Sequence, residues 1–255
     1  MKRKILVGNW KMNKTIAETI DFVAKINERA LEVASEEVII GIAPSFICLP
    51  VLRKLGTGII SFAQNVHFAD KGAYTGEVSP LMLKEIGVNA SLVGHSERRK
   101  HFAETNEVCN QKLQALEKHN FNAIYCIGET VEERQQGLSK EVIKKQVLEG
   151  IEGLSKEYIS NLTIAYEPIW SISTSGIGEN ATIEIASEAC KYVNEVISEK
   201  YGEEVGDSVY VLYGGSVNPD NIKEYVNDEN IDGVLVGGAS LTAESFLGMI
   251  NNMLD

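Results

Sequence analysis

The sequence predicts a closed (β/α)₈ barrel, in which eight parallel strands are ringed by helices. The chain has 255 residues, and about 250 residues is a typical length for one such barrel. Eight short apolar runs, rich in valine and isoleucine, are typical of parallel strands that are buried on both faces. Amphipathic segments with a helical period separate these runs. An open, doubly wound sheet is the alternative, because alternation alone does not prove that the sheet closes.

The candidate strands are spread along the whole chain. They are Ile5–Val7, Val38–Ile42, Gly58–Phe62, Ala90–Val93, Asn122–Ile127, Leu162–Tyr166, Val209–Tyr213 and Gly233–Val236. The clearest apolar stripes at helical spacing are Ile16 to Val33, Ile143 to Leu154 and Ala186 to Ile197, and a short last helix is expected near Ala243 to Met253. Because no Pro/Ser-rich linker or block of charge divides the chain, we expect residues 1–255 to form one domain.

The composition argues against several classes of binding partner and cofactor. The formal net charge is −12, which argues against a nucleic acid or an anionic membrane surface. No apolar run approaches the roughly 18 residues that a membrane-spanning helix needs, and no signal-peptide pattern opens the chain. The four cysteines are widely spaced, which fits free thiols in a reducing cytoplasm, so we expect a cytoplasmic protein. The four histidines show no metal-ligand spacing, and we expect no metal and no redox cofactor.

The chain is organised around the stretch from Leu162 to Trp170, where an apolar run leads directly into Glu167. Pro168 follows and cannot donate a ladder hydrogen bond, so the strand should end at Glu167. A carboxylate at the tip of a buried strand is unusual, and burial there would make it a usable base. The alternative is a charge that simply faces water. The Ser-, Thr- and Gly-rich stretch from Trp170 to Asn180 has the composition of a mobile loop.

In a barrel, the chemistry is found where strands end and loops begin. Lys11 follows the first strand and could meet an anion over the barrel mouth, although an ordinary solvated lysine is the alternative. His95 follows the fourth strand and could be an acid or electrophile, although a structural hydrogen bond is the alternative. Glu97 is expected to form an ion pair at a helix start, as are Arg98 and Arg99, although it lies close enough in sequence to tune the same site. Glu129 follows the fifth strand, and an exposed acid beside a helix cap is its alternative.

A glycine pair follows each of the last two strands, Gly214-Gly215 before Ser216 and Gly237-Gly238 near the end of the chain. Paired glycines let backbone amides approach an oxyanion closely, and a helix that starts beyond them adds a partial positive charge. In barrels, the loops after strands seven and eight often form a phosphate site. A tight turn explains either pair alone, but it is a weaker explanation for two pairs at these strand ends.

The segment from Gly176 to Ala181 matches the dinucleotide fingerprint G-x-G-x-x-A, but we discount this match. The fingerprint requires its glycines in the tight turn directly after a strand, and here about ten residues separate them from Glu167. Where a second strand should carry a ribose-binding acid, the pattern around Glu195 and Glu199 is helical.

Several specific motifs occur along the chain in a fixed order. They are Gly8 to Asn13, Gln64-Asn65 with Gly72 to Pro80, Val93 to Arg99, Cys126 to Thr130, Ala165 to Trp170, and the two glycine pairs. In this order they resemble the triosephosphate isomerase family over essentially the whole chain. The resemblance implies the barrel fold and an isomerase that interconverts dihydroxyacetone phosphate and D-glyceraldehyde 3-phosphate, through an enediolate, in glycolysis and gluconeogenesis.

The resemblance also implies roles for single residues. Glu167 would be the base and His95 the electrophile, and the substrate would also meet Lys11 and Asn9. The implied phosphate ligands are backbone amides, those of Ser173, Ser216, Gly237 and Gly238. The implied supporting residues are Glu97, Cys126, Glu129 and Tyr213, of which Tyr213 would act with Ser216 as a latch for a lid that starts at Pro168.

The lid is where the sequence departs from the family. Both lid glycines of the family are serine here, at Ser173 and Ser175, and the lid is a few residues longer. Ser173 still has a backbone N–H, so phosphate capture could survive. A longer lid that ends in Gly-Ile looks similar to relatives that isomerise four-carbon ketose phosphates, so a tetrulose phosphate isomerase is one alternative. A phosphate-binding barrel without turnover is another.

The stretch from Gln64 to Ser79 predicts a long loop without periodicity. Such a loop in a compact domain is usually functional. In the resembling family it crosses to a second subunit and packs beside that subunit's Asn9, Lys11 and His95. The resemblance therefore implies a homodimer with Thr75 near the partner's site, whereas a mobile surface loop is the alternative.

Overall fold

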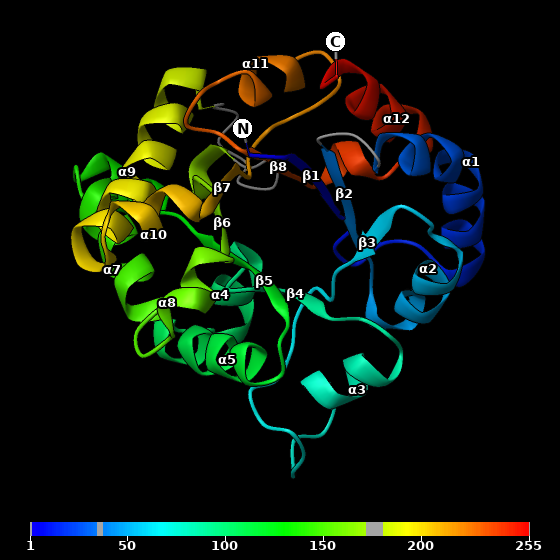
Figure 1. Cartoon of the computed structure of the whole chain (residues 1–255), viewed down its shortest axis with the longest axis horizontal. Coiled ribbons are helices and arrows are strands. Elements are labelled where there is room, and N and C mark those ends of the chain that lie inside the picture. Colours follow the sequence, from blue (N-terminus) through cyan, green and yellow to red (C-terminus); the bar gives the residue numbers. More distant parts are fainter. Residues whose placement is uncertain (1, 35–37, 172–180, 255) are drawn as a thin grey trace.

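The computed structural model describes residues 2–34, 38–171 and 181–254. Within them lie eight parallel strands: β1 (Lys4–Asn9), β2 (Val38–Ala43), β3 (Ile59–Ser61), β4 (Ala90–Val93), β5 (Asn122–Ile127), β6 (Thr163–Tyr166), β7 (Tyr210–Tyr213) and β8 (Gly233–Val236). Their order in the sheet is β3-β2-β1-β8-β7-β6-β5-β4. Ala63, just beyond β3, pairs with Ser91 of β4, and hydrogen bonds of 2.8 Å join Ala63 to Ala90 and Leu92. The sheet is therefore a closed barrel, as predicted, and not an open doubly wound sheet (Figure 1).

Helices surround the outside of the barrel (Figure 1). The longer ones are α1 (Ile16–Ala34), α5 (Asn106–Lys118), α7 (Ser139–Gly150), α9 (Ile183–Tyr201) and α12 (Ala243–Asn252). The shorter ones are α2 (Leu49–Leu55), α3 (Pro80–Glu85), α4 (Ser96–Phe102), α6 (Val131–Gln135), α8 (Lys156–Ser160), α10 (Glu203–Ser208) and α11 (Ile222–Val226), with the 3₁₀ turns η1 (Phe46–Cys48), η2 (Ile169–Ser171) and η3 (Gly238–Ser240). Most of the predicted apolar stripes are buried, as at Ile26, Val147, Val193 and Phe246. The prediction is wrong at Ile16 and Ile20, in the first two turns of α1, which are exposed.

Two apolar layers fix the strands. Inside the barrel, side chains from alternate strand positions pack together, among them Val7, Leu92, Ile124, Leu212 and Leu235. A second and larger layer fills the space between the strands and the helices. Each such side chain stabilises the fold by about 1.5–3 kcal/mol when it is fully buried. The ends of the strands are consequently rigid supports for the residues that follow them.

Strand β6 ends at Tyr166, one residue before the predicted end at Glu167. The hydrogen bonds between β6 and β5 nevertheless continue for one more residue. The amide of Glu167 donates to the carbonyl of Ile127 at 2.7 Å. Pro168 has no N–H and stops the ladder there. On the other side, the amide of Gly214 donates to the carbonyl of Tyr166 at 2.8 Å. Glu167 is therefore fixed at the carboxyl end of the barrel, between the ends of β5 and β7.

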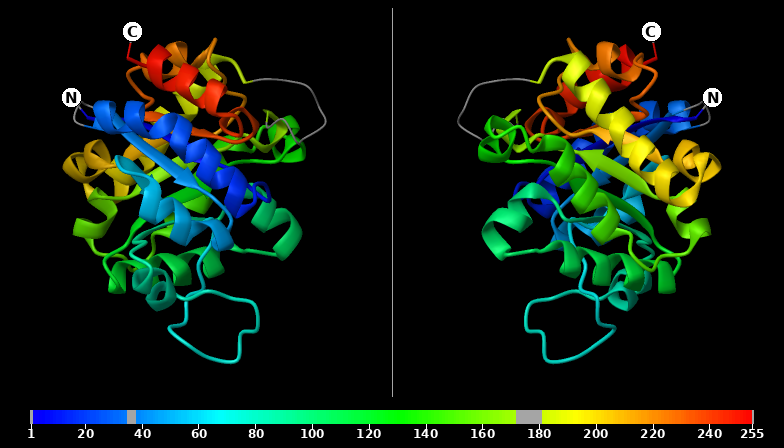
Figure 2. Two further views of the ribbon diagram at one scale, coloured as in Figure 1. Left: turned by 90° about the vertical axis from the view of Figure 1, so that its right-hand side faces the viewer. Right: turned by 90° about the vertical axis from the view of Figure 1, so that its left-hand side faces the viewer.

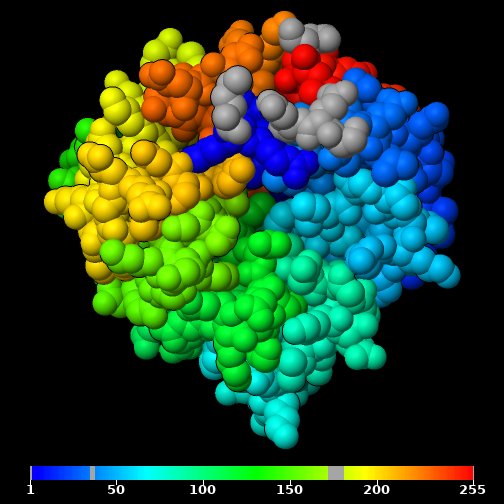
Figure 3. Space-filling view, in the orientation of Figure 1, coloured from blue at the N-terminus to red at the C-terminus, as the bar shows by residue number. Residues whose placement is uncertain are grey.

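The loop of residues 64–79 projects from the barrel wall between β3 and α3 (Figure 2). Its base is tied down, because the amide of His67 donates to the carbonyl of Val78 at 2.8 Å. The ring of His67 also packs on Phe68 and Tyr74, at centroid distances of 4.3 and 4.0 Å. Residues 71–77, which include Thr75, are exposed, and the loop forms a knob at the edge of the space-filling surface (Figure 3).

Candidate active site

The predicted site residues meet in a cavity of about 230 Å³ at the end of the barrel where the strands finish. Its walls are formed by Asn9, Lys11, His95, Glu167 and residues 214–218 and 235–239. This set includes Ser216, Gly237 and Gly238, so the predicted base, electrophile and phosphate ligands lie together. Ser173 lies outside the described residues, as do residues 176–180 of the discounted fingerprint. The volume is below the roughly 300–1,000 Å³ of pockets for drug-sized ligands, which suits a small substrate.

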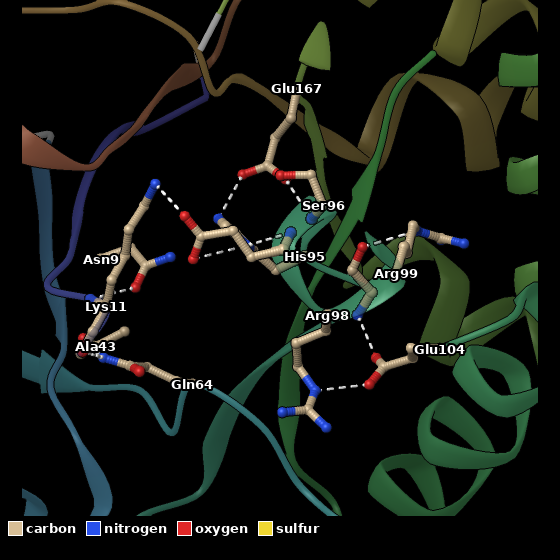
Figure 4. Close-up of polar contacts among 12 residues, drawn as sticks. Asn9, Lys11, Ala43, Gln64, His95, Ser96, Arg98, Arg99, Glu104 and Glu167 are labelled. Atoms are coloured by element: carbon tan, nitrogen blue, oxygen red, sulfur yellow. Dashed lines mark hydrogen bonds and ion pairs between the residues drawn. The ribbon is translucent and has the colours of Figure 1, made fainter. Parts of the chain in front are cut away.

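Lys11 is held over the cavity by strained backbone. Its φ is +52°, in the left-handed region that costs a residue with a side chain about 1–2 kcal/mol. Asn9 Oδ1 accepts from the amide of Lys11 at 3.0 Å, and Gln64 Nε2 donates to its carbonyl at 2.8 Å. Its ammonium group pairs with Glu97 Oε1 at 2.7 Å (Figure 4). Its place on the cavity wall and its pairing with Glu97 set Lys11 apart from an ordinary solvated lysine.

His95 follows β4 and caps the first turn of α4. Its Nδ1 accepts from the amide of Glu97 at 3.2 Å, so the ring proton is assigned to Nε2. Only 6% of the residue is exposed. Its Nε2–H is therefore a buried donor that points into the cavity.

Glu167 is 3% exposed and faces His95 across the cavity floor. Its Oε1 lies 3.2 Å from His95 Nε2, and its Oε2 accepts from the amide of Ser96 at 3.2 Å. In Figure 4, dashed lines join Glu167 to His95 and to Ser96. The prediction that this carboxylate is buried is confirmed, and the alternative of a charge that faces water is wrong. Sequence reasoning missed Ser96, because its contribution is a backbone amide that carries no side-chain signal.

The glycines after β7 and β8 leave room for the two charged side chains. A Cβ at Gly214 would lie 2.7 Å from Glu167 Cγ, and a Cβ at Gly237 would lie 3.3 Å from Lys11 Cε. Gly238 begins the turn η3. Gly214 and Gly237 thus allow backbone to reach the cavity wall beside both charges. The close approach of their amides to an oxyanion stays a prediction.

Glu129 is fully buried, so the alternative of an exposed acid is wrong. Its Oε1 accepts from the Tyr166 hydroxyl at 3.1 Å and from the Trp170 indole N–H at 2.9 Å, and its carbonyl accepts from the Ile169 amide at 3.1 Å. The Arg134 guanidinium lies 3.6 Å from the centre of the Trp170 ring. Glu129 therefore fixes the turn that directly follows Glu167.

Two other predicted supporting residues lie near this turn. The Tyr213 hydroxyl is 3.4 Å from Ser171 Oγ, and the Ser216 hydroxyl donates to the Ser171 carbonyl at 2.9 Å. Cys126 is fully buried, and burial together with the Glu167 charge raises the pKa of its thiol well above the usual range. Cys126 packs in the apolar interior of the barrel as a protonated thiol, and its supporting role stays a prediction. All four cysteines are free and buried.

A buried charge cluster behind His95 was not predicted from the sequence. Glu104 Oε1 accepts from the amide of Gly94 at 2.9 Å, and its Oε2 pairs with Lys112 and with Arg98. Lys112 also donates to Asn65 Oδ1 at 2.7 Å, at the base of the projecting loop. Burial opposes ionisation of Glu104, but the two cations outweigh it and hold the pKa of its carboxyl below the usual range.

Replacement of Glu104 by glutamine should lower the free energy of unfolding by about 3–5 kcal/mol at pH 7, because Lys112 would remain buried without its carboxylate. Since the folded-state pKa is depressed, this stabilisation is present above the unfolded value of about 4.3. It is lost as the pH falls through the folded-state value. Urea unfolding at several pH values measures both effects. Glu199→Gln, at the exposed pair with Lys144, is the control with no measurable loss. A loss for Glu104→Gln as small as that of the control contradicts the prediction.

Among the described residues, no helix combines the length and the apolar character that crossing a bilayer requires.

Comparison with known proteins agrees with this geometry. The family model described as "Triosephosphate isomerase" matches residues 4–253. Proteins named triosephosphate isomerase are similar over their whole length: that of Carboxydothermus hydrogenoformans is 45% identical over 256 residues, which is 100% of both chains. That of Dictyoglomus turgidum is 46% identical over 254 residues, or 99% of this chain and 100% of the relative. That of Clostridium botulinum (strain Langeland) is 45% identical over 253 residues, or 98% and 100%. The chain therefore belongs to the triosephosphate isomerase family.

Proposed function

We propose that this isomerase interconverts dihydroxyacetone phosphate and D-glyceraldehyde 3-phosphate, with Glu167 as base and His95 as electrophile. The observation that carries the proposal is the contact of 3.2 Å between the buried Glu167 carboxylate and Nε2 of the buried His95 ring. Both line a small cavity that also contains an ammonium group and two glycine pairs. Base, electrophile and phosphate ligands are the groups that an aldose–ketose isomerisation needs.

The proposed reaction begins when the substrate enters between Glu167 and His95. Glu167 removes a proton from C1 of dihydroxyacetone phosphate, and the C–H electrons form a C1–C2 double bond while negative charge moves to the C2 oxygen. The Nε2–H of His95 and the ammonium group of Lys11 stabilise this oxyanion. After a proton moves between the two oxygens of the enediolate, Glu167 returns its proton to C2 and the aldehyde forms at C1. No atom is gained or lost.

The phosphate group would be held at the glycine pairs. Backbone amides at Ser216, Gly237 and Gly238 supply partial positive charge, and Lys11 supplies a full one, within an overall acidic protein. A lid that closes over the site through Ser173 would keep water from the enediolate.

A triose phosphate is favoured over a tetrulose phosphate as the substrate. The relatives described above are all named triosephosphate isomerase. A coupled assay with dihydroxyacetone phosphate and with a four-carbon ketose phosphate tests this choice. We expect kcat/KM to be higher for the triose, and a higher value for the four-carbon substrate contradicts the proposal.

The working unit would be a cytoplasmic homodimer of single-domain chains, acting in glycolysis and gluconeogenesis. Large apolar side chains are exposed in the segments that follow the first four strands, among them Met12, Ile47, Tyr74, Leu81, Met82 and Phe102. Met12, beside Lys11, is 96% exposed. A second copy that receives residues 64–79 would cover such a surface and bring Thr75 close to the partner's site.

Sedimentation at micromolar concentration should therefore show a particle of twice the chain mass. Thr75→Arg should shift it toward the monomer and lower turnover, because a large charge would enter the contact. Leu31→Arg, on the exposed outer face of α1, is the control and should stay dimeric. A wild-type protein that sediments only as a monomer contradicts the proposed dimer.

A further inference from the structure

We propose that Gln146 of α7 is a positioning residue for the proton transfer, because its amide fixes Gly128 and, through Gly128, the main chain of Glu167. This inference rests on the function proposed above. Gln146 is not among the residues that line the cavity, so it would act on the rate without touching the substrate.

The contact between Gln146 and Gly128 is a two-point clamp. The amide N–H of Gly128 donates to Gln146 Oε1 at 2.7 Å, and Gln146 Nε2 donates back to the Gly128 carbonyl at 3.1 Å. One side-chain amide thus satisfies both the donor and the acceptor of one residue. Two bonds in opposite directions fix the orientation of Gly128 as well as its position.

Gly128 is in direct contact with the backbone of Glu167. A Cβ at residue 128 would overlap the carbonyl oxygen of Glu167, so the two main chains touch there. On either side of Gly128, the carbonyl of Ile127 accepts from the Glu167 amide at 2.7 Å, and that of Glu129 accepts from the Ile169 amide at 3.1 Å. A shift of Gly128 therefore displaces the segment that carries the base.

Gln146 is itself held on the barrel by β5. The Tyr125 hydroxyl donates to the Gln146 carbonyl at 2.7 Å, and Arg99 Nη2 lies 3.2 Å from that hydroxyl. Arg99 also donates through Nε to the carbonyl of Gly94 at 2.8 Å, immediately before His95. The hydrogen bonds that hold Gln146 therefore continue to the backbone beside both Glu167 and His95. Misplacement of a reacting group by about 1 Å can cost roughly 10²-fold in rate, so a smaller shift has a measurable effect.

Gln146→Met tests the clamp, because methionine has a similar length and makes neither hydrogen bond. We expect kcat for dihydroxyacetone phosphate to fall by about tenfold, while KM stays within about twofold, since the phosphate ligands are unchanged. Gln114→Met is the matched control, because Gln114 is exposed on α5 and bonds Asn110 Oδ1. Its kcat should equal that of the wild type. Circular dichroism and thermal unfolding establish that each variant is folded at the assay temperature.

Gln146→Glu provides a readout that a purely structural role would not change. Above its pKa the new carboxylate can accept from the Gly128 amide but has no proton for the Gly128 carbonyl. When protonated, it offers one donor and one acceptor, as the amide does. The ratio of its kcat to that of the wild type should therefore be low at pH 8 and rise as the pH falls toward 5, whereas the Gln146→Met ratio should be flat.

Wild-type kcat in folded Gln146→Met overturns the proposal, and so does a Gln146→Glu ratio that is flat from pH 8 to pH 5. The wild type is measured in the same assay. Its failure to turn over dihydroxyacetone phosphate would count against the proposed function instead, so the two failures are distinguishable.

Discussion

Replacement of Glu167 by glutamine is expected to lower kcat by about 10²–10⁴-fold, the usual contribution of a general base. Glutamine has nearly the same size and still offers an oxygen to the Ser96 amide, which now donates to Glu167 Oε2 at 3.2 Å. It cannot accept a proton from carbon. The loss should therefore fall on kcat with little change in KM. Steady-state turnover in both directions measures it.

Two controls test whether the loss comes from the missing base. Glu167→Asp retains the carboxylate but draws it back from His95, so its kcat should lie between those of Glu167→Gln and the wild type. Unfolding midpoints should be close to the wild-type value for both variants, because the β6 ladder and the core are untouched. A folded Glu167→Gln variant with kcat within about tenfold of the wild type contradicts the role of Glu167 as base.

His95→Gln is expected to lower kcat by about 10²–10³-fold, the cost of losing one preorganised donor to an oxyanion. The imidazole is fixed by the bond between its Nδ1 and the Glu97 amide, at 3.2 Å, whereas a glutamine side chain has more rotatable bonds and no such anchor.

His101→Gln is the matched control, because His101 is exposed on the same helix. Its kcat should equal that of the wild type. Equal rates for His95→Gln and His101→Gln would remove His95 from the mechanism.

The pattern of short Val- and Ile-rich runs in the sequence predicted the fold. Each predicted run coincides with a strand to within one or two residues, because a strand buried on both faces must be apolar throughout. The pattern alone did not establish that the barrel closes. Closure depends on the bridge between Ala63 and Ser91, and Ala63 lies just beyond the end of the predicted third strand.

The candidate site was predictable where its chemistry lies in side chains at strand ends, as for Lys11, His95 and Glu167. It was not predictable where a residue acts through the backbone, as Ser96 does, or from a helix, as Gln146 does. Gln146 occupies a polar position between the apolar Ile143 and Val147, which is what any amphipathic helix shows. The strained φ of Lys11 also left no signal, because lysine is not a residue that marks a left-handed conformation.

The most direct test of the account is a crystal structure with an inert, phosphorylated mimic of the enediolate bound. The account predicts that the phosphate of the mimic contacts the amides of the two glycine pairs, and that its oxygens lie between His95 Nε2 and Lys11 Nζ. The Glu167 carboxylate should lie over its carbon atoms. A mimic that binds elsewhere, or one whose carbon atoms are out of reach of Glu167, would contradict the account.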